Sequence, residues 1–162
     1  MTITLPTVEG QYLHDLVEEY LQVIGDAASS SDTAVDRLTP DIYPDDPEAS
    51  AAFRTAMHDD LLGRRRHDAQ VVLASLTALT RSDAQPAGAR RAAEVVQLTD
   101  TELDAWLRTL SAMRLIMADR LGIVTEDTHD PDDLRFGVYD WLGYRLDQLV
   151  SAADDRDAAN GR

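Results

Sequence analysis

Residues 99–122, TDTELDAWLRTLSAMRLIMADRLG, decide the fold class of this chain. Thr99 and Glu102 form the pattern of a capping box, in which each side chain satisfies a free backbone donor at the start of a helix. Apolar residues then recur three or four positions apart, and Gly122 follows as a stop signal. The residues of this apolar face are Leu103, Trp106, Leu107, Leu110, Met113 and Met117. The segment predicts an amphipathic helix that places Trp106 in a core.

Two more helices are predicted upstream. One opens near Thr7 and is closed by Gly25. A loop rich in Ser, Asp and Pro follows over residues 26–45, and Asp46-Pro47 then supplies a cap and a first helical residue. From there a long or kinked helix is expected to run to about residue 80. The two predicted apolar faces are Leu13, Leu16, Val17, Tyr20, Leu21 and Ile24, then Phe53, Met57, Leu62, Arg66, Ala69, Leu73, Leu76 and Thr80.

A last helix, approached through the acidic run HDPDD at residues 129–133, carries Val138, Trp141, Leu142 and Leu149 on its apolar face. We expect Trp141 to be a core residue. Residues 153–162 are predicted to be a frayed tail. The sequence therefore predicts one helical domain over residues 1–152, an all-α bundle of four or five helices.

Two short extended pieces, residues 3–5 (ITL) and 96–98 (VQL), each stand four positions before a glutamate at a helix start. They are either strand-like residues that happen to precede helix caps, or a two-stranded ribbon that packs beside the bundle.

The composition narrows the class of protein. A chain of 162 residues with 44% hydrophobic residues can form one domain that buries roughly 70% of the surface of the unfolded chain. There is no cysteine, which excludes disulfides, thiolate metal sites and cysteine nucleophiles. The first residues carry no basic segment, and no apolar run approaches 18 residues, so we expect a cytoplasmic protein without a membrane span.

The charge distribution disfavours nucleic acid as a partner. The formal net charge is −15, and an acidic chain repels phosphate backbones and acidic membranes. Residues 1–50 hold eleven acids and one arginine, residues 51–100 hold six acids and seven arginines, and residues 101–162 hold thirteen acids and seven arginines. A basic face is therefore expected only in the middle third.

No catalytic, metal-binding or cofactor-binding residues are predicted. The four histidines lack the spacing of common zinc motifs and are interpreted as solvated surface residues: His14, His58, His67 and His129. Glycine-rich phosphate loops and serine nucleophile motifs are absent from the sequence, so we do not expect an enzyme. Met113 and Met117 lie one helical turn apart. Core packing is the favoured interpretation of this pair, and a methionine redox sensor is the alternative.

Three consecutive arginines lie within the long predicted helix at positions 64–66. If the helix is continuous, Arg66 falls on the apolar stripe and needs an acidic partner, because an unpaired buried charge is costly. Arg64 and Arg65 lie toward the flank. We interpret them as contacts for a protein partner, with DNA as the alternative ligand.

Four stretches together resemble an actinobacterial family of small helical proteins that includes the oxidative-stress transcriptional regulator AosR. They are RLTPDIYPDDPEASAAFR (37–54), DLLGRR (60–65), LDAWLRTLSAMRLIMADRLGI (103–123) and VYDWLGYRLDQLV (138–150). The resemblance implies cytoplasmic regulation through a protein partner in the transcription or proteolysis machinery. Thiol sensing by that regulator needs cysteines, so no sensing residue is carried over to this chain.

The function expected from the sequence is therefore that of a cytoplasmic regulatory or adaptor protein that acts through protein contacts. A transcriptional regulator that binds DNA directly is the alternative.

Overall fold

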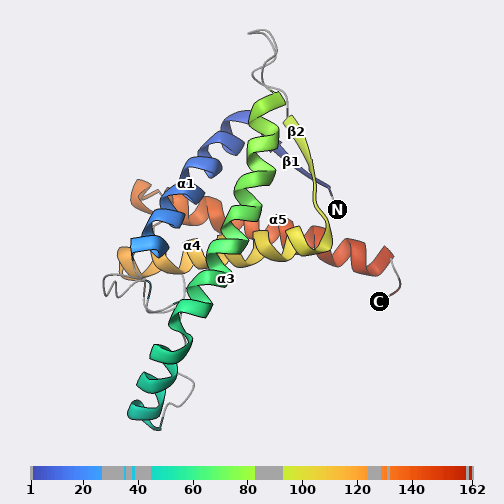
Figure 1. Ribbon diagram of the computed structural model, residues 1–162. Coiled ribbons are helices and arrows are strands. Elements are labelled where there is room, and N and C mark those ends of the chain that lie inside the picture. The colour runs from blue at the N-terminus through green and yellow to red at the C-terminus, as the bar shows by residue number, and fades with distance from the viewer. Residues whose placement is uncertain are drawn as a thin grey trace.

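A computed structural model describes residues 2–26, 35, 38, 45–82, 93–123, 129, 130, 132–159 and 161. In these residues, four α-helices and one short 3-10 helix accompany a two-stranded sheet (Figure 1). The order along the chain is β1 (Thr2–Pro6), α1 (Thr7–Asp26), α3 (Pro47–Ser82), β2 (Ala93–Gln97), α4 (Asp100–Leu121), η1 (Leu134–Phe136) and α5 (Gly137–Ala159). The all-α class with a short ribbon is confirmed.

Helix boundaries follow the predicted caps. Asp46 accepts a hydrogen bond from the backbone N–H of Ala49 at 2.9 Å, as the cap of α3. The capping box of α4 is complete, because Thr99 N donates to Glu102 Oε2 at 2.8 Å and Glu102 N donates to Thr99 Oγ1 at 3.3 Å. Gly122 ends α4 in the left-handed conformation, with φ of 74°. Helix α5 continues to Ala159 and so includes most of the residues for which the sequence predicts a frayed tail.

The two extended pieces pair, so the ribbon is confirmed. Strands β1 and β2 are antiparallel, with Ile3 opposite Val96 and Leu5 opposite Glu94. Leu5 and Val96 are buried, which ties the ribbon to the helical core. Hydrophobic burial, rather than the few backbone hydrogen bonds of two short strands, keeps such a ribbon in place.

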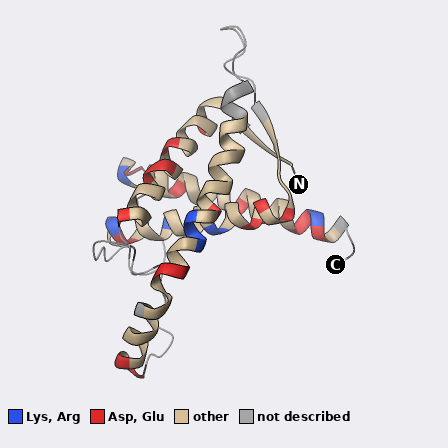
Figure 2. Cartoon of the chain, in the orientation of Figure 1, with Lys and Arg blue, Asp and Glu red and all other residues tan. Residues whose placement is uncertain are grey.

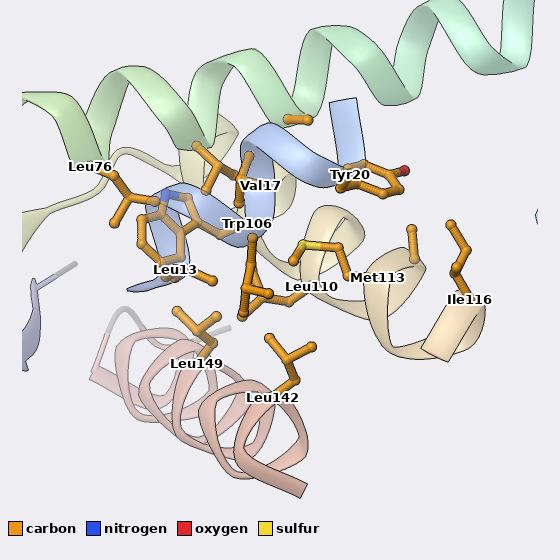
Figure 3. Close-up of a cluster of buried hydrophobic side chains, with 14 of the residues drawn as sticks. Leu13, Val17, Tyr20, Leu76, Trp106, Leu110, Met113, Ile116, Leu142 and Leu149 are labelled. Atoms are coloured by element: carbon orange, nitrogen blue, oxygen red, sulfur yellow. The ribbon is translucent and has the colours of Figure 1, made fainter. Parts of the chain in front are cut away.

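One core joins all four long helices (Figure 3). Helix α1 packs on α3, α3 packs on α4, and α4 packs on α5. Side chains from the four helices converge around α4, and those labelled in Figure 3 are Leu13, Val17, Tyr20, Leu76, Trp106, Leu110, Met113, Ile116, Leu142 and Leu149. Trp106 is 1% exposed and Met113 is 3% exposed, while Met117 packs against the cluster from its edge. Core packing of both methionines is confirmed.

Helix α3 is much longer than its neighbours and crosses α4 near its own middle (Figure 1). Its 36 residues correspond to roughly 54 Å at 1.5 Å per residue. The C-terminal part packs on α1 and α4, and the N-terminal part extends beyond the other long helices (Figure 1). The crossing of α3 and α4 positions the candidate site described next.

Candidate functional site

A groove of about 1010 Å³ lies where α3 crosses α4, and Figure 2 shows basic residues gathered on α3 at this crossing. We call it the α3–α4 groove. Its lining residues are Leu38, Asp59, Asp60, Leu61, Gly63, Arg64, Arg65, His67, Asp68, Leu107, Arg108, Ser111, Ala112 and Leu115. Two of the three consecutive arginines, Arg64 and Arg65, therefore line one hollow together with apolar side chains from both helices.

Arg64 stands at the groove with its side chain 74% exposed. One of its terminal nitrogens pairs with Asp60 one turn earlier, at 2.9 Å. A guanidinium carries five N–H donors, and a single contact to one carboxylate oxygen leaves most of them available to a ligand. This geometry agrees with the interpretation of Arg64 as a contact for a partner.

Arg65 is held by the protein itself. Its guanidinium donates to the backbone carbonyl of Leu38 at 2.7 Å, and its side chain is half-buried. Arg65 also lies beside the buried Tyr20. Burial raises the pKa of the Tyr20 hydroxyl, and the positive charge of Arg65 offsets part of that rise. Arg65 thus joins α3 to Leu38 while it lines the groove.

Arg65, which the sequence placed toward the flank of the helix, makes a tertiary hydrogen bond. The sequence placed Arg66 on a stripe through Leu62, Ala69, Leu73 and Leu76. The most buried residues of this part of α3 are Leu62, Ala69, Val72 and Leu76. From Ala69 onward the buried positions alternate by three and then four residues, as in a heptad pattern. The same alternation before Ala69 steps three residues from Leu62, which puts position 65 rather than 66 on the buried face. Arg66 is half-buried beside this stripe.

Helix α4 supplies the opposite wall. Arg108 donates to both oxygens of Asp68, at 2.8 and 3.0 Å, and this bidentate contact raises the pKa of Arg108. The pair joins α3 and α4 across the groove. Leu107 and the 39% exposed Leu115 add apolar surface from the same helix. The groove therefore has an apolar floor and a rim that carries both arginines and aspartates.

This arrangement is suited to binding rather than to acid–base chemistry. A hollow between two helices with exposed leucines and a charged rim is the form in which proteins accept an amphipathic helix of a partner. His67 and Asp68 are neighbours in sequence, but both oxygens of Asp68 are engaged by Arg108. Asp68 therefore does not orient His67.

Three of the four histidines, His14, His58 and His129, are half-buried rather than on the predicted solvated surface. His129 has a side chain only 13% exposed, stacked on Phe136 at 4.1 Å, with Nε2 3.0 Å from Asp140. This contact ties the chain before η1 to α5. His14 lies on α1 with Asp15 and Glu18, and these three side chains could together ligate a metal ion, because one possible ligand atom of each lies within 4.8 Å of the others. The i, i+4 spacing of His14 and Glu18 was the sequence signal that could have pointed to this cluster. Both carboxylates are more than half exposed on one helix.

Trp141 was predicted to be a core residue, and this prediction is only partly right. The ring packs at the edge of the core, half-buried, against Tyr12 at 5.6 Å between ring centroids. Its Nε1 donates to Glu9 Oε2 at 3.1 Å, and Arg145 forms an ion pair with the same oxygen. Burial lowers the pKa of Arg145, although a guanidinium stays charged at physiological pH. This polar contact explains why the Trp141 ring stays at the surface.

The comparisons with known proteins give a family. No curated protein and no solved structure matches the chain significantly. Among the described helices, none combines the length and the apolar character needed to cross a membrane. Residues 1–153 match the family described as "Domain of unknown function (DUF2017)". The match covers far more than half of the chain, and the protein therefore belongs to this family.

Proposed function

We propose that this protein is a cytoplasmic regulatory or adaptor protein that binds a partner protein in the α3–α4 groove. The observation that carries the proposal is the position of Arg64, exposed beside the apolar floor between α3 and α4. The resemblance to AosR-like regulators supports a role in transcriptional regulation during oxidative stress. With no cysteine in the chain, any signal reaches it by a route other than a thiol switch.

The occupant that fits best is an acidic amphipathic helix. Leu107 and Leu115 offer apolar contacts, and Arg64, with a side chain 74% exposed, offers guanidinium donors at the rim. Exposed arginines next to an apolar surface are typical of the residues that dominate binding energy at protein interfaces. A DNA duplex would instead bring a dense line of phosphates toward a chain with net charge −15, and that repulsion opposes binding.

The test is the substitution Arg64→Glu in the full chain, with Arg135→Glu as the matched control. Arg135 is 76% exposed and pairs with Asp133, so the control has the same exposure and also breaks one ion pair. Arg65 is left intact because its hydrogen bond to Leu38 supports the fold. Both variants and the native chain are used to recover partner proteins from host extract, with quantification by mass spectrometry. Binding to a fluorescent DNA duplex is measured at low salt.

We expect a defined protein that the native chain and Arg135→Glu recover equally and that Arg64→Glu loses by roughly tenfold. Identical recovery by all three forms would contradict the proposal. Submicromolar and steeply salt-dependent DNA binding that Arg64→Glu abolishes would instead establish the alternative, a regulator that binds DNA directly.

A further inference from the structure

A second cleft, of about 450 Å³, lies between strand β1 and helix α5 and shares no lining residue with the α3–α4 groove. Four consecutive residues of β1, Thr2 to Leu5, form one wall. Successive side chains of a strand point to opposite faces of a sheet, so a cleft lined by four in a row follows the edge of the strand. Among the described side chains of β2, Val95 to Gln97, none lines the cleft, so the cleft lies on the side of β1 that faces away from these residues.

This edge of β1 is available for backbone pairing. Within the part of the chain that the structure describes, the sheet contains only β1 and β2. An edge strand presents a row of N–H and C=O groups to which an extended segment can add as another strand. The cleft provides the space beside that row, and α5 forms its far wall.

The far wall is acidic. Asp147 and Asp155 line it, and neither carboxylate forms an ion pair with another residue in the described ranges. The basic residue of the cleft, Arg145, is already paired with Glu9. Tyr144 adds an aromatic ring that is 56% exposed, and the guanidinium of Arg145 already lies 5.5 Å from its centroid. The two carboxylates favour a ligand with basic side chains.

We propose that this cleft binds an extended basic peptide, which adds to the outer edge of β1 as a third strand and directs its arginine or lysine side chains toward Asp147 and Asp155. Backbone pairing supplies affinity without regard to sequence, and the acidic wall selects the basic side chains. The proposal concerns a different surface from the α3–α4 groove, so it does not depend on the function proposed above.

A second copy of the chain is a poorer occupant of the same edge. In a symmetric dimer the same patch meets itself, so each acidic wall would approach another copy of net charge −15. Like charges brought together at an interface oppose association. The charge of the wall therefore favours a basic peptide over self-association.

The probe is the fluorescein-labelled peptide TRVRVRT, with both ends blocked, and the readout is fluorescence anisotropy with the full chain. The test variant is Asp147→Asn with Asp155→Asn. The control is Asp15→Asn with Asp154→Asn, which changes the net charge equally at exposed sites outside the cleft. We expect the test variant to bind the peptide roughly tenfold more weakly and the control to stay within about twofold. Circular dichroism verifies that all forms are equally folded.

Two further peptides test the strand pairing. Each carries N-methyl groups on alternate backbone nitrogens, one set facing β1 and the other facing away. We expect one methylated peptide to lose binding and the other to keep it, because pairing uses the N–H groups of alternate residues. The proposal is overturned if the native chain does not bind TRVRVRT, if both double variants weaken binding equally, or if both methylated peptides bind. A stable dimer that dissociates as the peptide binds would assign the edge to a second copy and would overturn it as well.

Discussion

Helices α4 and α5 have nearly the same length, 22 and 23 residues, and each carries one tryptophan on an apolar stripe. Eight residues of α4 are buried, whereas the buried residues of α5 are Tyr139, Leu142 and Leu149. Helix α4 packs between α3 and α5, while α5 packs on α4 from the outside. Hydrophobic spacing therefore identifies which face of a helix packs toward the core. It does not show how many other helices will cover that face.

We expect the largest difference in stability between variants of α4 and α5 at their two tryptophans. Trp106→Ala is expected to lower the free energy of unfolding by about 3–5 kcal/mol, because the ring is 1% exposed and leaves a cavity. Trp141→Ala is expected to cost about 1–2 kcal/mol, because this side chain is only partly buried at the edge of the core. Urea denaturation of both variants measures the difference. Equal costs would show that α5 is as deeply enclosed as α4.

A smaller effect is expected at the polar contact that holds α5 to α1. Arg145→Met leaves Glu9 without its cation, and we expect a loss of about 2 kcal/mol, between the values for exposed and fully buried pairs. The combined variant with Glu9→Gln is expected to lose less than the sum of the two single changes. Urea denaturation measures all three variants.

The matched control for that experiment is Arg135→Met, which removes an arginine with a 76% exposed side chain and is expected to change stability by less than about 0.5 kcal/mol. A loss at Arg145 no larger than the loss at Arg135 would mean that α5 is held by its apolar contacts alone.

The smallest effect is expected at the start of α4. Thr99→Ala removes one side of the capping box and is expected to cost about 1 kcal/mol near neutral pH. Hydrogen bonds from Thr99 lower the pKa of Glu102 below its ordinary value of 4.5. The stabilisation from ionised Glu102 is therefore complete above about pH 4.5 and is lost as the pH falls through the lower pKa of the folded state.

The stability difference between the native chain and Thr99→Ala should therefore shrink on acidification below pH 4.5, as measured by urea denaturation at several pH values. Glu102→Gln is the control, since it cannot titrate. A difference that stays constant with pH would show that the Glu102 carboxylate contributes nothing to the cap.

Most of the fold could be predicted because its signals are local. The cap at Asp46, the capping box at Thr99 and Glu102, and the stop at Gly122 each depend on residues within one helical turn. The buried face of α1 also agrees with its spacing of apolar residues. The strand pairing was visible only as two similar short pieces, and their separation along the chain left a chance similarity as the favoured interpretation.

The site was harder to predict because its contacts are not local. The partner of Arg65 is a backbone carbonyl 27 positions away, and a backbone group leaves no mark in sequence. Glu9 reaches Trp141 across 132 positions, so periodicity alone placed Trp141 in the core. His129 looked like a solvated residue because Phe136 and Asp140 meet it only after the chain turns through η1. The α3–α4 groove exists only once two helices cross.

The pairing of Thr2 with Gln97 has a consequence for the synthesis of this protein. Gln97 lies 95 positions after Thr2, and a ribosome needs about 5–20 s to add that many residues. Throughout that time β1 has no strand to pair with. The nascent chain thus carries an open strand edge next to apolar surface, which is the state that molecular chaperones protect. The first strand to be made therefore cannot pair until more than half of the chain has been synthesised.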